Sequence, residues 1–315
     1  MRRSFKDYLI ITAKGMAMGA ADVVPGVSGG TIAFISGIYE ELINTISGVK
    51  VGLLYTWKNV GFKAMWKELN GNFIVALLAG ILFSIFTVMR ITNYLLENHP
   101  ILIWSFFFGL VLASVYYVAK QIPKWTFNVF LFLIIGAGFA LYVTSLPPIT
   151  AAASDLYLFF AGAIAICAMI LPGISGAFIL VLLGAYKTVS EAAHDFDFKI
   201  LGIVGLGAVF GLLSFSRLLK WLFINYSTLT LAVLTGFIAG SLNKIWPWKR
   251  QLETLELGDK VITIRDESVM PWNFHAEPHT LQAFVLMLAG FALILILEGL
   301  AEIKPVQENA GNPNV

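Results

Sequence analysis

The chain has 315 residues and a net charge of +2, and 58% of its residues are hydrophobic but only 13% are charged. Soluble domains carry about 25% charged residues, so this composition excludes a water-soluble globule and indicates an integral membrane protein. The near-balanced charge gives no indication of nucleic-acid binding, and a single cysteine, Cys167, excludes an intramolecular disulfide.

The first apolar region, residues 8–47, is interrupted by "VVPGVSGGT" at 23–31. Its basic start is like that of a signal peptide, but Lys14 interrupts the apolar run and no small-residue cleavage site follows, so we expect it to be retained. Each uninterrupted piece has roughly 15 residues and reaches only about 22 Å, short of a crossing. We therefore predict a re-entrant helical hairpin, whose backbone must be satisfied by protein or by a water-filled cavity.

The remaining elements follow in chain order. Lysines and tryptophans among apolar residues at 48–71 predict an amphipathic helix on the membrane surface. A second interrupted region, 156–190, contains "LPGISGAF" at 171–178 and predicts a second hairpin. Residues 247–279 form an extramembrane insertion, in which "TLELGDKVITIRDE" alternates around a Gly-Asp pair and predicts a β-hairpin. Apolar runs near the length of a membrane span occur at 72–97, 100–119, 127–146, 200–223, 228–246 and 280–300.

The chain repeats itself. Gly15 to Tyr39 match Gly162 to Tyr186 at an offset of 147, and after the surface segment the offset becomes 127, so that Arg90 meets Arg217. The last helices share "AGFAL" at 137–141 and 289–293. We predict an all-α polytopic membrane protein of two repeats, 1–155 and 156–315, each a re-entrant hairpin followed by three transmembrane helices.

Three spans per repeat is an odd number, so the second repeat must insert upside down. Inverted repeats with broken helices are typical of secondary transporters. Lysines and arginines concentrate in the N-terminal segment, the 48–71 segment and the loop near 120–124, which predicts a cytoplasmic N-terminus and C-terminus.

The interruptions indicate an anion site. Glycine turns bring backbone amides close to a ligand, and the N-terminus of the following helix attracts negative charge. The alternative is a helix kink packed on small residues, but its occurrence in both repeats favours a phosphate-binding site. The expected residues are Gly26, Ser28, Gly29, Gly30, Thr31, Gly173, Ser175 and Gly176.

Charged residues inside the apolar runs are the other candidates. Arg90 and Arg217 occupy matching positions, and a guanidinium suits phosphate, although either side chain can instead reach the membrane interface. Lys14 and Asp22 have no charged counterparts; either they pair, or Asp22 binds a coupling proton or sodium ion. The histidines lack zinc-like spacing, so no metal or cofactor is expected.

On "GAADVVPGVSGGTIAFISGIYE" and "LPGISGAF", the chain resembles the bacterial polyprenyl-phosphate (undecaprenyl-phosphate) transporter family, formerly a membrane domain of unknown function. The resemblance implies a flippase of the bacterial cytoplasmic (inner) membrane. It would return the undecaprenyl phosphate carrier lipid to the cytoplasmic leaflet for envelope polymer synthesis, by alternating access. Its partners would be that lipid and the surrounding membrane lipids.

Two alternatives remain open. An undecaprenyl-pyrophosphate phosphatase-like enzyme also has inverted repeats and a PGxSRS-like turn, but here glycines follow Ser28, and Asp22 alone replaces the paired glutamates. We therefore do not expect an enzyme. A transporter of a small soluble anion would use the same turns and arginines, and only a sideways opening to lipid distinguishes it.

Overall fold

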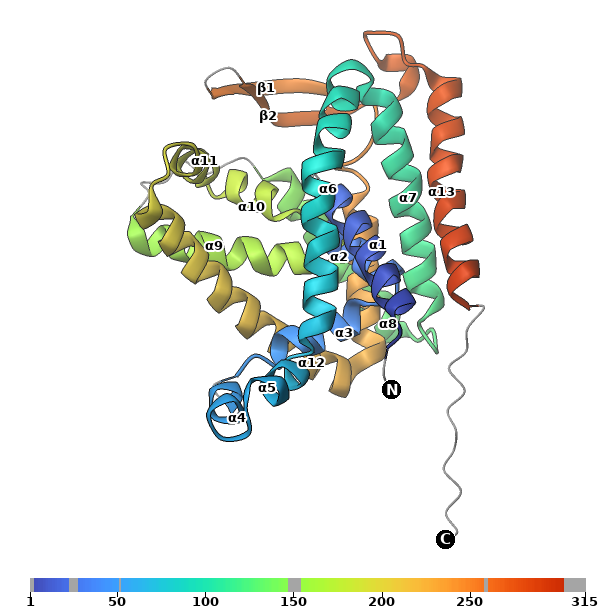
Figure 1. Cartoon of the computed structure of the whole chain (residues 1–315). Helices are drawn as coiled ribbons and strands as arrows, with labels where there is room; N and C mark the ends of the chain where they lie inside the picture. Colours follow the sequence, from blue (N-terminus) through green and yellow to red (C-terminus); the bar gives the residue numbers. More distant parts are fainter. Residues whose placement is uncertain (1–2, 23–27, 51, 147–153, 258–259, 303–315) are drawn as a thin grey trace.

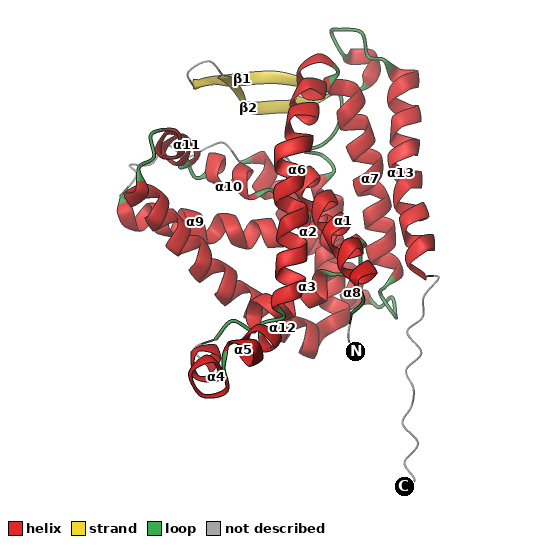
Figure 2. Cartoon of the chain, in the orientation of Figure 1, coloured by secondary structure: helices red, strands yellow, loops and turns green. Residues whose placement is uncertain are grey.

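The computed structural model describes residues 3–22, 28–50, 52–146, 154–257 and 260–302 (Figure 1). Within these ranges the chain is helical except for one two-stranded sheet, as the composition predicts (Figure 2). The first half contains α1 (Phe5–Asp22), α2 (Gly29–Ile35), α3 (Tyr39–Ser47), α4 (Gly52–Val60), α5 (Phe62–Glu68), α6 (Gly71–Asn98), α7 (Pro100–Lys120) and α8 (Phe127–Ser145). The second half contains α9 (Asp155–Ile170), α10 (Gly176–Leu182), α11 (Tyr186–His194), α12 (Phe198–Ser241), β1 (Lys249–Leu257), β2 (Lys260–Ser268), η1 (Pro271–Asn273) and α13 (Thr280–Glu302).

All six apolar runs form helix. By length and composition, three of the described helices can cross a membrane, and five spans result if each of two bent helix pairs counts as one. The runs 200–223 and 228–246 form the two parts of α12, which meet at the non-helical residue Tyr226. The second part stops at Ser241, not at 246, because the chain turns there and then reaches Pro247, which disfavours helix in the residue before it.

Both interrupted regions are broken twice rather than once. The first arms, α1 with 18 residues and α9 with 16, reach about 27 and 24 Å at 1.5 Å per residue. Each second arm is split again, at Gly37 (φ 72°) and at Gly184 (φ 65°). Only glycine adopts these left-handed angles at little cost, so glycine allows the second arm to break at these two positions.

The predicted surface helix over 48–71 is also two helices, and the single-helix prediction was wrong. Gly61, with φ 107°, separates α4 from α5. Large apolar side chains on both remain exposed, among them Tyr55, Trp57 and Phe62. This pair lies at the opposite end of the molecule from β1 and β2 (Figure 1).

Matching positions of the two halves make matching contacts. A Cβ on Gly80 would lie 2.0 Å from the Thr12 carbonyl oxygen, and one on Gly207 would lie 1.9 Å from that of Phe159. The helix ends at His99 (φ −137°, ψ 51°) and Tyr226 (φ −139°, ψ 42°) also agree. Thus α1 crosses α6 as α9 crosses the first part of α12, at the same pairs of positions.

The last helix of each half packs on the middle helix of the other. A Cβ on Gly136 of α8 would lie 2.4 Å from Val233 O, and one on Gly290 of α13 would lie 2.1 Å from Phe106 O. Phe106 and Val233 are matching positions at the offset of 127. The equivalent of Gly290 by contact is therefore Gly136. The "AGFAL" match would pair Gly290 with Gly138, so that match was wrong by two residues.

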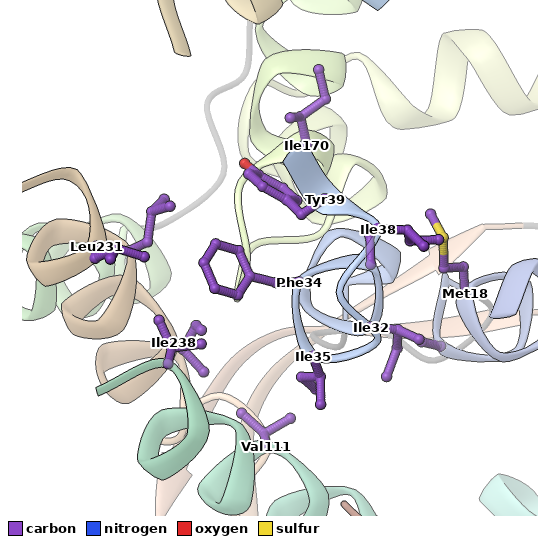
Figure 3. Close-up of a cluster of buried hydrophobic side chains, with 14 of the residues drawn as sticks. Met18, Ile32, Phe34, Ile35, Ile38, Tyr39, Val111, Ile170, Leu231 and Ile238 are labelled. Carbon is purple, nitrogen blue, oxygen red and sulfur yellow. The ribbon is translucent and has the colours of Figure 1, made fainter. Parts of the chain in front are cut away.

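The core surrounds α2, all seven of whose residues are buried. Side chains of α1, α3, α7, α9 and α12 enclose it, and the tilted rings of Phe34 and Tyr39 are in contact, with centroids 5.0 Å apart (Figure 3). Ser28, the residue immediately before α2, is buried as well and lies close to the centre of the packed helices.

The predicted β-hairpin is confirmed. β1 and β2 pair antiparallel from Lys249 opposite Ser268 to Leu257 opposite Lys260, and the Gly-Asp turn itself lies outside the described residues.

Candidate functional site

The two helix breaks meet at the centre of the molecule. The Ser28 hydroxyl donates to the carbonyl oxygens of Met169 and Leu171, at 3.0 and 3.3 Å. In return, the amide of Gly173 donates to Thr31 Oγ1 at 3.0 Å. A Cβ on Gly30 would lie 2.5 Å from Ile170 O, so only glycine permits this approach. We call these three hydrogen bonds the interbreak joint.

The N-terminus of α2 is fully occupied by the protein itself. Ser28 is its N-cap residue, and Ser28 Oγ accepts from the amide of Gly30 at 3.1 Å. The carboxylate of Asp22 accepts from the amide of Gly29 at 2.7 Å, and Thr31 N donates to Ser28 O at 2.9 Å. In this conformation a phosphate reaches these amides only by displacing Asp22 and Ser28.

The second break has the same backbone plan but different chemistry. Ser175 occupies the N-cap of α10 without a side-chain capping bond, and Gly173 has φ 92°. In the first break Asp22 lies against Gly29. At the matching positions of the second break Met169 lies against Gly176, since a Cβ on Gly176 would lie 3.3 Å from Met169 Cβ. The acid is therefore specific to the first break. Gly26 lies outside the described residues.

Lys14 and Asp22 do not form the ion pair considered above. The Lys14 ammonium donates to Ser36 O at 2.5 Å, in the turn after α2, while Asp22 accepts from Gly29. The Asp22 carboxylate thus compensates the positive end of α2 rather than a side-chain charge.

The arginines are placed unequally. Arg217 is exposed, and its guanidinium donates to Val49 O at 2.8 Å in the connection between α3 and α4. No hydrogen bond or ion pair joins Arg217 to the breaks within the part of the chain that the structure describes. Arg90 lies on α6, and its side chain is outside the described ones.

Two buried polar groups were missed. The Tyr39 hydroxyl is buried and has no hydrogen-bond partner within the described residues, as is also true of Ser84 Oγ. Tyr39 packs on Phe34 and on Phe223, whose ring centroid is 6.1 Å away. The match of Tyr39 with Tyr186 was the available signal, but it did not indicate a buried hydroxyl.

The described residues contain no group of three or more His, Cys, Asp or Glu side chains placed to hold a metal ion.

Comparison with known proteins gives consistent results. The family described as "VCA0040-like: Undecaprenyl phosphate translocase-like" matches residues 18–260. The chain is 46% identical over 301 residues to a polyprenyl-phosphate transporter of Vibrio cholerae, covering 94% of this chain and 98% of the relative. It is 32% identical over 252 residues to a polyprenyl-phosphate transporter of Staphylococcus aureus, covering 74% and 84%. No solved structure matches it.

Proposed function

Because this chain belongs to the undecaprenyl phosphate translocase-like family, we propose that it transports a polyprenyl phosphate across the membrane, and specifically returns undecaprenyl phosphate to the cytoplasmic leaflet. It is a multi-pass membrane transporter and not an enzyme. The similarity to the Vibrio cholerae relative over nearly the whole chain supports a polyprenyl phosphate as the substrate. The interbreak joint supports a site for its phosphate between the two breaks.

We propose that the halves are inverted repeats. The matching contacts of Gly80 with Gly207 and the matching angles of His99 and Tyr226 support this proposal. The start of α1, the end of α13, and the α4–α5 pair lie at one end of the molecule (Figure 1). With the lysine-rich α4–α5 pair on the cytoplasmic side, both termini are cytoplasmic and the β-hairpin is extracytoplasmic.

The residues of the breaks would replace the water around the phosphate. Moving a charge of about −1 to −2 through hydrocarbon requires donors at every depth, since an unpaired charge there is expensive. Opening of the interbreak joint frees the hydroxyls of Ser28 and Thr31 and the amide of Gly173. Each neutral hydrogen bond contributes a net ~0.5–1.5 kcal/mol, whereas bonds to a charged group contribute about 1.5–3. Exchange of the joint for a phosphate is therefore favourable, which supports alternating access.

The remaining expected site residues have distinct roles in this proposal. Gly29, Gly30, Ser175 and Gly176 line the breaks, while Arg90 and Arg217 receive the phosphate nearer the two membrane faces. Gly26 lies outside the described residues and stays an expected contributor to the phosphate site. Asp22 competes with the phosphate for the Gly29 amide. Protonation of Asp22, or its binding of a cation, would remove that competition and couple an ion to transport.

The experiment is leaflet exchange of a labelled polyprenyl phosphate in liposomes containing the purified protein. Wild type is compared with Arg90→Ala/Arg217→Ala and with Ser28→Ala/Thr31→Val. Loss of exchange in both variants supports the full site. Loss of exchange only in Ser28→Ala/Thr31→Val would mean that the two arginines anchor the protein at the membrane interface and do not bind the phosphate. Absence of exchange in folded wild type, with and without an ion gradient, would contradict the proposed function.

A further inference from the structure

The Tyr39 hydroxyl is a buried polar group that the proposed site does not use. Tyr39 is 2% exposed, and its hydroxyl has no hydrogen-bond partner within the described residues. A buried hydroxyl without a partner destabilises the native state, and a phenylalanine would fill nearly the same volume without that loss. Most buried polar groups in native proteins are paired, so this one requires an explanation.

Tyr39 packs beside the helix face that carries the interbreak joint. Its ring contacts that of Phe34, with centroids 5.0 Å apart. Phe34 follows Thr31 by three residues in α2, so the two side chains lie on one face of that helix, about 4.5 Å apart along its axis. Thr31 is the residue that accepts from Gly173. The Tyr39 ring is therefore about one helical turn from the joint.

The other neighbours of this ring come from the second half of the chain. The ring of Phe223, in the first part of α12, lies edge-on with its centroid 6.1 Å away. Figure 3 shows the Tyr39 side chain between Phe34 and Ile170, and these three residues belong to one buried cluster. Ile170 ends α9, and its carbonyl oxygen is the one that Gly30 approaches. Tyr39 thus lies between the two halves, on the side where the joint opens.

The segments that hold the ring both end at breaks. α3 begins two residues after Gly37, whose φ is 72°, and α12 is interrupted at Tyr226, three residues after Phe223. Hinges in proteins are formed by a few residues at such element ends. The surroundings of Tyr39 can therefore change when α2 separates from the end of α9, without unwinding of either helix.

The Tyr39 hydroxyl can gain a hydrogen bond to phosphate without losing one. Ser28 and Thr31 must each exchange a bond of the joint for a bond to the phosphate. Tyr39 has no such bond within the described residues. Its phenolic O–H is a donor, and a hydrogen bond to a charged acceptor is roughly twice as strong as one between neutral groups. Of the three hydroxyls, that of Tyr39 therefore has the largest net gain from a bound phosphate.

We propose that Tyr39 is a substrate-binding residue, whose hydroxyl donates to the phosphate of the lipid once the interbreak joint is open. The closed conformation leaves the hydroxyl unpaired and the loaded one pairs it, so Tyr39 favours the loaded conformation. This inference rests on the proposed function and deepens it, because it adds a donor that distinguishes a phosphate from a neutral headgroup.

The test is binding of farnesyl monophosphate, a short polyprenyl phosphate, to the full-length protein in detergent, measured by thermophoresis beside farnesol. Tyr39→Phe should weaken binding of the phosphate about tenfold or more, as expected for loss of one hydrogen bond to a charged group. Its thermal midpoint without ligand should not fall, which excludes unfolding as the cause. Wild-type affinity for farnesyl monophosphate, or an equal loss for farnesol, would overturn the proposal.

Ser84→Ala is the matched control, since it also removes a buried hydroxyl without a described partner. Ser84 lies where α6 crosses α1, because a Cβ on Gly19 would lie 3.1 Å from Ser84 Cβ. This variant should bind farnesyl monophosphate as wild type does. An equal loss of affinity in Ser84→Ala and Tyr39→Phe would show that removal of either orphan hydroxyl has the same effect, and would refute a contact specific to Tyr39.

Leaflet exchange distinguishes this inference from the proposed function. At limiting lipid, Tyr39→Phe should exchange about tenfold more slowly than wild type, and Ser84→Ala should match wild type. If wild type exchanges lipid and Tyr39→Phe equals it in both assays, the assignment of Tyr39 is wrong while the transporter stands. If folded wild type neither binds nor exchanges the lipid, the proposed function and this inference are both wrong.

Discussion

The interbreak joint allows a quantitative prediction for Thr31→Val. Thr31 is 1% exposed, and its hydroxyl oxygen accepts from the amide of Gly173 at 3.0 Å. Valine has nearly the same shape but no acceptor, so the variant leaves a buried amide without its partner. An unsatisfied buried donor costs about 1–3 kcal/mol, which corresponds to a shift of roughly 5–150-fold away from the joined conformation.

Thr235→Val is the matched control. Thr235 is also 1% exposed, but its hydroxyl donates to Leu231 O at 2.7 Å, a carbonyl within its own helix. Its removal leaves no orphan amide, so we expect a loss below about 1 kcal/mol.

The assay is thermal unfolding of both variants in one detergent. At roughly 2–4 °C per kcal/mol, Thr31→Val should lower the midpoint by about 2–12 °C, and by clearly more than Thr235→Val. Saturating polyprenyl phosphate should restore part of this loss, since it supplies an acceptor for the freed donors. Equal shifts in the two variants would refute the reasoning that the joint holds the breaks together.

Three further predictions concern packing, the orphan hydroxyl and the hairpin. Gly207→Ala should destabilise the protein by about 1–3 kcal/mol in thermal unfolding, because its Cβ would lie 1.9 Å from Phe159 O, whereas Gly205→Ala meets open space and should be neutral or stabilising. Tyr39→Phe removes a buried hydroxyl without a described partner and should raise the thermal midpoint, whereas Tyr157→Phe removes a donor to Leu183 O and should lower it; the reverse order would contradict the assignment. Burial by itself would raise the pKa of Asp266, but the ammonium groups of Lys244 and Lys249 outweigh it and hold that pKa below its usual value. The native state thus favours the ionised carboxylate, and its stabilisation is complete above the unfolded pKa of about 3.9 and lost as pH falls through the lower folded pKa. Hydrogen-exchange protection of β1 and β2 should therefore be constant from pH 7 to 5 and fall below pH 4; Asp266→Asn should show lower protection at pH 7 and no such step.

The sequence by itself determined the class of the protein and most of its helices. Low charge and long apolar runs require a membrane, and in a membrane the backbone must pair within helices. The proline–glycine motifs at 25–30 and 172–176 predicted an interruption in each apolar region, and new helices do begin at Gly29 and Gly176. The repeat was visible because matching positions such as Gly80 and Gly207 carry the same steric requirement.

The sequence did not predict the helix boundaries at which a single glycine ends a helix by its backbone angle. Gly37, Gly61 and Gly184 each divide a segment that the sequence predicts as continuous, because glycine adopts negative and positive φ about equally readily and the sequence does not say which. The equivalence of Gly290 and Gly136 in the two repeats likewise depends on which backbone carbonyl each glycine contacts in the neighbouring helix, and not on the residues next to it in the sequence.

Only the tertiary structure decided what the candidate site is made of. Ser28 and Met169 are 141 residues apart in the chain, and no local pattern shows that the hydroxyl of one caps the carbonyl of the other. Asp22 could equally have paired with Lys14 by sequence, yet it accepts from the amide of Gly29 because α1 and α2 pack together. Helix formation follows from the few residues on either side of each peptide bond, whereas a hydrogen bond between two breaks exists only after the helices that carry them have packed.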